Sequence, residues 1–207
     1  MKRRFTLVML SLLVLLVAGF AVAQDKKPEG GQGQGMGMSP EDMAAMEKAG
    51  TPGEQHKRMA AMAGNWTYTM KMWMAPGQPP AEATGTMEAS TILGGRYLQS
   101  TYKGMVMGAP FEGHGLDGYD NVKQEFFSTW VDNMSTGVMV STGKCNDPDC
   151  KVMTMSSEMP DPTTGKPMKV REVSTHIDKD NMKFEMFMSP GGQGEFKNME
   201  LNLKRKS

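Results

Sequence analysis

The stretch "NWTYTMKMWM", residues 65–74, places an apolar side chain at every second position. Because successive side chains of a β-strand point to opposite faces, this alternation predicts a strand with one apolar face. The side chains predicted to share that face are Trp66, Tyr68, Met70, Met72 and Met74. Three of them are methionines, and the whole chain contains 24 methionines in 207 residues. The role of these methionines is therefore the first question that the sequence raises.

The same alternation recurs to the end of the chain, interrupted by turns rich in Gly, Pro, Asn and Asp. The ten predicted strands are residues 65–74, 83–92, 96–105, 111–119, 125–131, 137–144, 151–159, 169–177, 183–188 and 196–203. No long helical pattern lies between them, which excludes parallel strands joined by crossover helices. The short connections favour an all-β fold, an antiparallel up-and-down barrel of about eight to ten strands, because closure removes exposed strand edges.

Two later strands repeat the apolar face of the first. Met153, Met155 and Met159 share one face, and a second set of alternating apolar residues begins at Met182. We therefore predict a barrel interior lined by methionine and aromatic side chains. The candidate lining residues are Trp66, Tyr68, Met70, Met72, Met74, Met153, Met155, Phe184, Met186 and Met188.

Three interpretations of the methionines remain open, in decreasing order of preference. The first is ordinary core, because methionine is flexible and replaces leucine at modest cost. The second is the lining of a cavity that accepts a small apolar ligand. The third is a Cu(I) or Ag(I) site, with Met105, Met107 and His114 as possible contributors. Because the excess of methionine is diffuse, we assign no metal ligands.

Residues 1–23 have the pattern of a signal peptide: a basic start, an uncharged apolar run and a small-residue end, with cleavage expected after Ala23. The apolar run is short for a membrane anchor, and no span is expected in the mature protein. We therefore expect an exported protein, either periplasmic or secreted.

Residues 24–50 are predicted to form a flexible Gly- and Gln-rich tether and a short helix, and residues 51–207 the barrel domain. Ser39 has the features of an N-cap for that helix, and a second short helix is expected to start at Thr51. The methionine pairs 43/46 and 59/62 are each spaced three residues apart, so each pair is predicted to dock on the core.

Charge and motifs exclude several classes of function. The chain has 23 basic and 23 acidic residues, interspersed, so no basic surface for nucleic acid is expected. No serine-nucleophile elbow, paired-histidine zinc motif or phosphate loop occurs, and we assign no catalytic residue and no cofactor. An enzyme is less expected than a binding protein. A haem site would need an axial ligand such as His176, but nothing in the spacing selects it.

The two cysteines, Cys145 and Cys150, flank the turn sequence "NDPD". In an exported protein such a pair is expected to form a disulfide that closes a hairpin loop. A redox pair or a zinc site is less favoured, because redox motifs usually have two intervening residues and zinc would need further ligands.

Several short segments carry a family resemblance. They are residues 56–66 (HKRMAAMAGNW), 93–96 (LGGR), 110–113 (PFEG), 118–121 (GYDN) and 130–133 (WVDN). As a set they resemble an uncharacterised bacterial family, domain of unknown function family 1579, which is usually assigned to the calycin-like (lipocalin-like) barrels. The resemblance extends from residue 51 to about residue 143. It implies the barrel fold and brings no established reaction.

These motif residues have two interpretations. As corner and closure elements, Gly94 and Gly95 permit a tight reversal, and Trp66 and Trp130 plug one barrel end. Arg96 is then expected to pair with an aspartate on a neighbouring strand, Asp120 or Asp132. The functional alternative is a polar cluster at the cavity mouth that orients a ligand's head group. Its candidate residues are Arg96, His114, Tyr119, Asp120, Trp130 and Asp132.

The function predicted from the sequence is non-enzymatic binding of a small apolar or amphipathic molecule inside the barrel. The alternative is an extracytoplasmic protein whose methionines bind Cu(I) or Ag(I) or are oxidised in place of other molecules. The sequence does not identify a ligand.

Overall fold

The computed structural model describes residues 37–192 and 194–207. The predicted signal peptide and most of the predicted tether lie outside the described residues. The described chain contains ten strands, and each predicted strand is present with its ends within a few residues of the expected positions. They are β1 Gly64–Met72, β2 Ala81–Ile92, β3 Tyr97–Val106, β4 Ala109–Asp120, β5 Glu125–Asp132, β6 Met139–Cys145, β7 Val152–Pro160, β8 Pro167–His176, β9 Asn181–Ser189 and β10 Phe196–Arg205.

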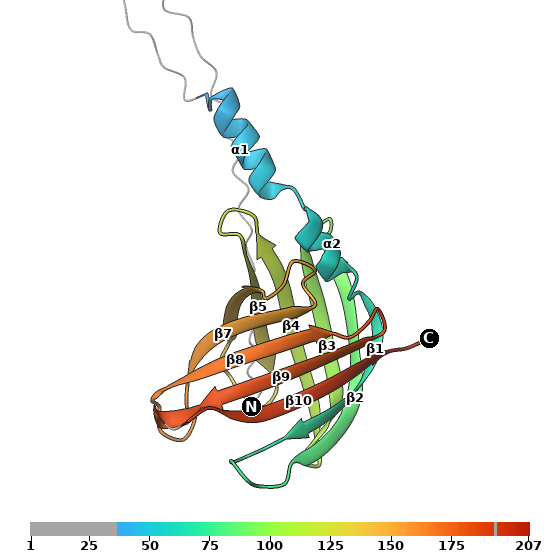
Figure 1. Ribbon diagram of the computed structural model, residues 1–207, viewed down its shortest axis with the longest axis vertical. Helices are drawn as coiled ribbons and strands as arrows, with labels where there is room; N and C mark the ends of the chain where they lie inside the picture. The colour runs from blue at the N-terminus through green and yellow to red at the C-terminus, as the bar shows by residue number, and fades with distance from the viewer. Residues whose placement is uncertain (1–36, 193) are drawn as a thin grey trace, which may run out of the picture. The chain divides into compact units, whose positions relative to one another are not determined.

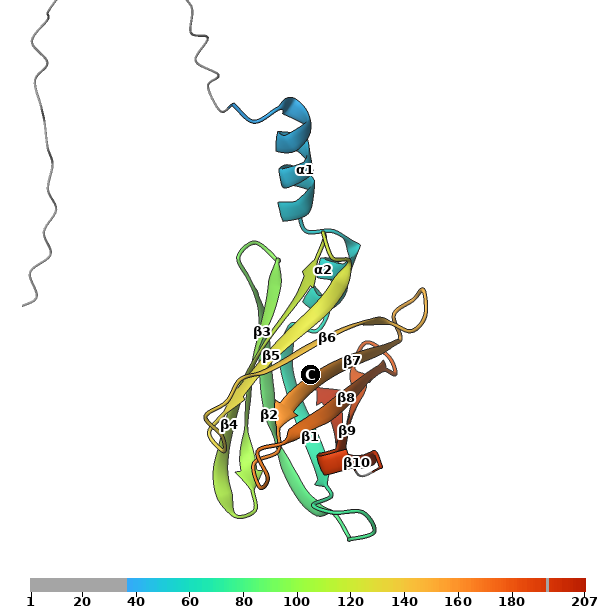
Figure 2. The same cartoon turned by 90° about the vertical axis from the view of Figure 1, so that its left-hand side faces the viewer.

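The ten strands close into a single barrel in which every neighbouring pair is antiparallel (Figures 1 and 2). Each strand pairs with the next one in sequence, and β1 closes the barrel by pairing with β10. The short turns allow this order, since antiparallel neighbours need only a hairpin connection. The predicted up-and-down antiparallel barrel is confirmed.

The first helix, α1, spans Pro40–Gly50 and begins as expected. The Ser39 hydroxyl accepts a hydrogen bond from the Asp42 backbone amide at 3.1 Å. No residue of α1 is buried, and Met43 and Met46 are 54% and 63% exposed. The prediction that this methionine pair docks on the core is therefore wrong, because a shared helical face is buried only where the helix packs on another element.

The second helix, α2, spans Glu54–Ala60 and does pack on the barrel. It starts three residues later than predicted, with Gly53 as its N-cap and the Gly53 amide donating to His56 Nδ1 at 3.0 Å. His56 and Met59 are buried, and the His56 ring meets Tyr119 of β4 edge-on at 5.9 Å. We call the barrel end beside α2 the near end and the opposite end the far end.

Trp66 anchors the core at the near end. Its side chain is 1% exposed, and its indole Nε1 donates to the Met62 carbonyl at 3.0 Å. The Arg205 guanidinium lies 4.1 Å from the ring centre and also pairs with Asp180 at 3.3 Å. The last strand is thereby attached to the first strand and to the β8–β9 turn.

Two glycines inside the barrel make room for Tyr68. A Cβ on Gly85 would lie 2.4 Å from the Tyr68 ring, and a Cβ on Gly104 would lie 2.6 Å from its hydroxyl oxygen. The Tyr68 hydroxyl donates to the Lys103 carbonyl at 3.4 Å. Tyr68 therefore lies flat against β2 and β3, occupying the space that two larger side chains would fill.

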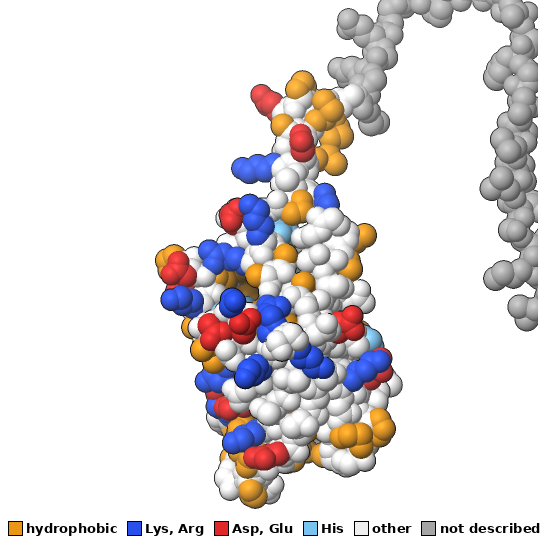
Figure 3. Space-filling view, turned by 90° about the vertical axis from the view of Figure 1, so that its right-hand side faces the viewer, with side chains coloured by type: hydrophobic (Ala, Val, Ile, Leu, Met, Phe, Trp, Pro, Cys, Tyr) orange, Lys and Arg blue, Asp and Glu red, His pale blue; other side chains and the backbone are white. Residues whose placement is uncertain are grey.

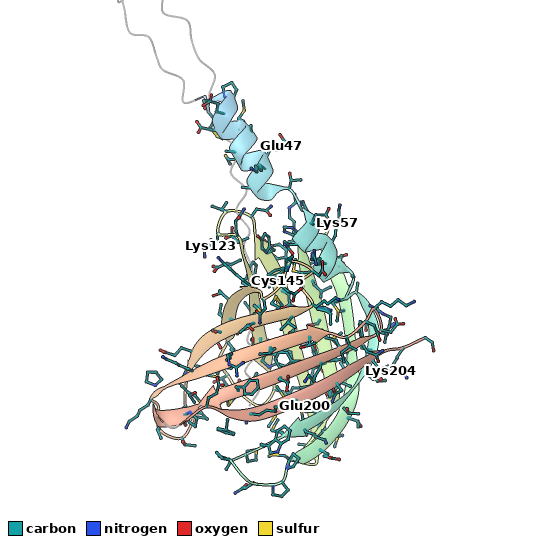
Figure 4. All side chains as sticks on the ribbon, viewed as in Figure 1. Glu47, Lys57, Lys123, Cys145, Glu200 and Lys204 are labelled. Carbon is teal, nitrogen blue, oxygen red and sulfur yellow. A yellow bond between two sulfur atoms is a disulfide. The ribbon has the colours of Figure 1, made fainter. Side chains whose placement is uncertain are left out.

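The predicted disulfide between Cys145 and Cys150 is present, with a Cα–Cα distance of 4.8 Å. Figure 4 shows Cys145 toward the barrel end where α2 lies. The Asp147 carboxylate accepts bonds from the Lys151 and Val152 amides at 3.0 and 2.9 Å, which shapes the turn. The disulfide thus closes a hairpin that the backbone hydrogen bonds already define.

The outer wall of the barrel is a mixed charged surface. Figure 3 shows basic and acidic side chains interspersed over one face of it. Lys197 of β10, for example, pairs with Glu200 at 2.8 Å and also with Glu185. Among the described helices, none is long and apolar enough to cross a membrane.

Candidate functional site

The strand methionines mostly face the interior. Met70, Met155 and Met186 are 7%, 6% and 8% exposed. Half-buried residues on the same inner face include Met72, Met153, Phe184 and Met188. Met74 is the exception among the candidates: β1 ends at Met72, and Met74 is 61% exposed. The assignment of Met74 to the interior is therefore wrong, because the chain leaves the strand before the alternation ends.

A row of polar side chains crosses the same interior. Asp117 of β4 pairs with Ser128 of β5, which pairs in turn with Ser141 of β6. Directly paired residues share a face, and Asp117 is on the face of Gly115 and Tyr119, which lie among the interior aromatics. Three neighbouring strands therefore turn polar groups inward at one level of the barrel.

Ser157 extends this row onto β7. It lies on the same face of β7 as the buried Met155. Its hydroxyl oxygen is buried and has no hydrogen-bond partner among the described residues, and the same is true of Ser141, which is fully buried. Buried polar groups normally have hydrogen-bond partners. Two neighbouring hydroxyls without partners therefore indicate a position where a bound polar group would complete these hydrogen bonds.

Glu172 of β8 adds a second acid to the row. It pairs with Met155 and Met186 in the sheet and is 6% exposed. Burial raises the pKa of Glu172 to about 6; the nearby Ser141 hydroxyl lowers this pKa and the charge of Asp117 raises it further. Burial also raises the pKa of Asp117 to about 6, against a lowering effect of a hydrogen bond from Ser128.

Neither interior acid is neutralised by a cation. No ion pair involving Asp117 or Glu172 occurs within the described part of the chain. The neighbouring cation on β8, Arg171, lies on the opposite face of the strand and binds Glu195 with two contacts of 2.9 and 2.6 Å. The two carboxyl groups therefore face the interior of the barrel without a cationic partner among the described residues, and the charge of Asp117 raises the pKa of Glu172.

Aromatic rings flank the acids. The Tyr102 ring lies 5.2 Å from Trp130 and 5.9 Å from Tyr68. Burial raises the pKa of the Tyr102 hydroxyl, and the charge of Asp117 on the neighbouring strand raises it further. We use the name interior polar cluster for Tyr102, Asp117, Ser128, Ser141, Ser157 and Glu172.

The interior is not sealed around this cluster. Asp117 and Tyr102 lie deep within the protein, yet both side chains are half-buried rather than fully buried. Ser174 and Phe184, paired on the inner faces of β8 and β9, are also half-buried. These inner-face side chains therefore remain partly accessible, and a barrel of this size is wide enough to hold a small ligand.

Two pockets lie at the surface. One, of about 470 Å³, lies on the outer wall and includes Lys71 and Trp73. The other, of about 460 Å³, lies at the near end between α2 and the β8–β9 turn, and includes His176 and Arg58. Because His176 faces inward from β8, opposite Met182, this near-end pocket adjoins the interior. Burial lowers the pKa of His176, which favours its neutral form.

The six motif residues proposed at a cavity mouth do not come together. His114 lies on the outer face of β4, where its Nε2 is 3.1 Å from Glu112 and its Nδ1 is 3.2 Å from Thr101. Asp120 caps the β4–β5 turn by accepting from two backbone amides at 2.8 and 3.0 Å. Tyr119 packs with Phe126 at the near end.

Arg96 and the tryptophans also differ from expectation. Arg96 donates to the Leu93 carbonyl at 3.1 Å and forms no ion pair with either expected aspartate among the described contacts. Trp130 and Asp132, joined by a 2.8 Å hydrogen bond, lie at the far end, whereas Trp66 lies at the near end. The prediction that both tryptophans plug one end is therefore wrong, because β1 and β5 present them at opposite ends.

The described residues contain no group of three or more His, Cys, Asp or Glu side chains that could hold a metal ion. Met105 and Met107, at the tip of the β3–β4 hairpin, are 52% and 64% exposed. His114 pairs with Thr101, which lies four residues before Met105 on β3. The backbone positions of His114 and Met105 are therefore separated by roughly 13 Å along the strands. The three possible thioether and imidazole ligands named from the sequence therefore do not converge.

The interior polar cluster was not predicted from the sequence. The sequence signal for this cluster is the position of Asp117 and Glu172 in their strands. Each lies an even number of residues from apolar residues that face inward, so each shares the inward face. On β8, the inward face reads Met-Val-Glu-Ser-His and the other Pro-Lys-Arg-Val-Thr, so both faces mix apolar and polar residues and the inward acid does not stand out. Only the strand pairing decides which face is inward.

Comparison with known proteins identifies the family. A family model described as "Protein of unknown function (DUF1579)" matches residues 51–205. The chain belongs to the DUF1579 family. The match spans the barrel and α2, so the DUF1579 region of this chain contains the entire interior polar cluster. No curated protein matches the sequence significantly.

One solved structure supports the fold of this DUF1579 protein. The crystal structure of Rv2717c from M. tuberculosis superposes with a TM-score of 0.52 at 15% identity, covering 76% of this chain and all of the other. A redesigned β-barrel, b11L5F_LGL, gives a TM-score of 0.39 at 19% identity, covering 72% and 95%. EF1p2_mFAP2b bound to DFHBI gives 0.37 at 11%, covering 78% and 99%. The first similarity concerns the fold alone, and no argument rests on the other two.

Proposed function

We propose that this protein binds a small amphipathic molecule inside its barrel without catalysing a reaction. The observation that supports the proposal is the interior polar cluster, which places uncompensated acids and unpartnered hydroxyls within a wall of methionine and aromatic side chains. Binding sites for small molecules combine a mostly apolar lining with a few convergent polar groups. An apolar body would contact the methionines, and a polar head would contact the cluster.

The entrance to such a site is the near end. The pocket beside α2 adjoins the inward-facing His176 and is lined on its other side by Arg58 and Met62 of the helical segment. Arg58 also donates to the carbonyls of Pro148 and Asp149, in the disulfide-closed turn. A molecule entering here would pass between α2 and the β8–β9 turn.

The test of this proposal uses octan-1-ol as a neutral amphipathic probe, titrated into the protein by calorimetry. Ser174→Phe places a ring on the inner face of β8 between Met153 and Phe184, whereas Thr175→Phe places it on the outer face. We expect saturable binding to wild type, a loss of about tenfold or more in affinity for Ser174→Phe, and no change for Thr175→Phe.

Two results would contradict the proposal. One is the absence of saturable binding to wild type up to about 1 mM probe, the weak limit of useful affinity. The other is an equal effect of the inner and outer substitutions, which would place the probe on the surface. Native mass spectrometry of protein purified from its own host, before and after organic extraction, would then identify the natural ligand by the mass that extraction removes.

A second candidate function has support from the exposed methionines. Met43, Met46, Met105 and Met107 are all more than half exposed, so oxidants reach their thioethers first. In this function the protein would be oxidised in place of other molecules. Peptide mapping after limited peroxide treatment tests it: oxidation should begin at these positions and leave the barrel folded.

The proposed location is outside the cytoplasm. Two features support export: the signal-like pattern of residues 1–23 in the sequence and the disulfide between Cys145 and Cys150. Disulfides form and persist in oxidising compartments. An N-terminal sequence of the protein recovered from its host tests this, since export predicts a mature chain that begins at Gln24.

A further inference from the structure

The charge inside the barrel is unbalanced. Asp117 and Glu172 influence each other electrostatically, and neither has an ion-pair partner in the described chain. The charged side chains beside them on the same strands lie outside: Arg171 binds Glu195, and His114 binds Glu112. The other ionisable groups at inner positions are Tyr68, Tyr102, Tyr119, Asp132, His176 and Arg205. Arg205 is the one cation among these described residues, and it lies at the near end, where it stacks on Trp66 and pairs with Asp180.

A second, independent feature points to a missing partner. Ser141 is 0% exposed and faces inward beside Ser128; its hydroxyl oxygen has no partner within hydrogen-bond distance among the described residues, although it lies near enough to the Glu172 carboxyl to lower the pKa of that acid. The hydroxyl oxygen of Ser157 on the next strand is also buried and also has no hydrogen-bond partner among the described residues. Serine hydroxyls both donate and accept, so they complete the hydrogen bonds of a donor group placed between the acids.

Aromatic rings line the same interior as the acids. Tyr102 and Trp130 meet edge to face at 71°, and Tyr68 is tilted by 49° to Tyr102. Aromatic faces attract ammonium groups, most strongly where water is excluded. Together, carboxylates, hydroxyls and aromatic faces form the set of groups that recognises an organic cation rather than an anion.

Resting on the ligand-binding function proposed above, we propose that the interior ligand carries a protonated amine that lies between Asp117 and Glu172. Its apolar part would lie along the methionine-lined wall that includes Met155 and Met186. Hard metal ions require several oxygen or nitrogen ligands in a compact shell, and the described residues contain no group of three or more acidic, His or Cys side chains of that kind. The class of ligand is therefore an amphipathic amine.

The experiment compares three probes of equal chain length at pH 7.5: n-octylamine, octan-1-ol and octanoate. Each is titrated by calorimetry into wild type, into the double variant Asp117→Asn/Glu172→Gln, and into Glu158→Gln. Glu158 is an exposed acid on β7 whose loss changes the net charge by one without altering the interior. Circular dichroism establishes that each variant is folded.

The expected result is that wild type binds octylamine about tenfold or more tightly than octanol, as a charge-assisted hydrogen bond should provide, and binds octanoate most weakly. The double variant should lose the preference for amine over alcohol while still binding octanol, and Glu158→Gln should behave as wild type. Calcium chloride alone, titrated in parallel, should give no heat of binding.

Each contrary outcome has a separate meaning. If wild type binds octanol and octylamine equally, the amine inference is overturned and the proposed function stands. If the amine preference persists in the double variant, or follows the loss of Glu158, the cation is attracted by the surface rather than the interior and the inference also fails. If calcium binds and octylamine does not, the acids form a metal site. If no probe binds, the proposed function fails as well.

Discussion

Replacing both interior acids by their amides, Asp117→Asn with Glu172→Gln, is expected to stabilise the ligand-free protein by about 3 kcal/mol at pH 8. Both carboxyl groups are ionised at that pH, and burial makes their charged forms unfavourable in the folded state. The amides keep the shape and hydrogen-bonding capacity of the side chains without the charge. The predicted gain in stability is smaller than the sum of the gains expected from the two single substitutions. Removing either charge already removes the repulsion between the two acids, so that repulsion is counted only once.

The sign of the pH dependence follows from the raised pKa values. In the folded state both acids titrate near 6, above their usual values of 3.8 and 4.5. Between about pH 4 and 6 the folded protein therefore holds more protons at these sites than the unfolded chain does. Their contribution to stability is fully present below about pH 4 and is lost as the pH rises through 6.

Other groups titrate in the opposite direction. His56 and His176 have lowered pKa values because of burial, so their contribution is lost as the pH falls below their unfolded value. The difference between wild type and the double variant isolates the two acids from these histidines.

Urea unfolding between pH 4 and 8 measures this difference. It should be close to zero at pH 4 and grow to its full value above pH 7, while Glu158→Gln stays within about 0.5 kcal/mol of wild type throughout. Two results would contradict this prediction: a stability difference between wild type and double variant that does not change with pH, or a double variant less stable than wild type at pH 8. Either result would mean that burial does not disfavour the ionised forms of the two acids.

Gly143→Ala is expected to destabilise the protein by about 4 kcal/mol. A Cβ at Gly143 of β6 would lie 2.0 Å from the Thr154 carbonyl oxygen and 2.6 Å from the Met155 Cα. Both contacts are with the backbone of β7, so no side-chain rotation relieves them and the two strands must separate. That separation would also move Ser141 and Met155, which flank Glu172.

Gly137→Ala is the matched control, because nothing lies within 4 Å of a Cβ placed there. Thermal and urea unfolding of both variants should show a large loss for Gly143→Ala and a change within about 0.5 kcal/mol for Gly137→Ala. If Gly143→Ala costs less than about 1 kcal/mol, the tight approach of β6 and β7 described here is incorrect.

The strands and their order were predictable because alternation and turn residues are local signals. Met153 and Met155 illustrate this: their spacing alone placed them on one face, and that face is the interior. Local spacing was misleading where packing decides. Met74 continues the alternation of β1 but lies beyond the strand, and Met43 and Met46 share a helical face that packs on no other described element.

The candidate site was less predictable because it depends on pairing between strands distant in sequence. Asp117, Ser141 and Glu172 each look like ordinary polar residues within a strand. They become a cluster only when closure of the barrel brings β4, β6 and β8 around one interior. The expected cost of the acidic pair to the stability of the empty protein is the pattern found where a binding site is retained against the preference for an apolar core.

The most direct test of the account is a ¹³C NMR titration of the side-chain carboxyl groups, with the two interior signals assigned by Asp117→Asn and Glu172→Gln. If the acids lie uncompensated inside the barrel, both should titrate with apparent pKa values of about 6 in the ligand-free protein. If both titrate near 4 instead, they are solvated or already paired, and neither the interior polar cluster nor its proposed cationic ligand would stand.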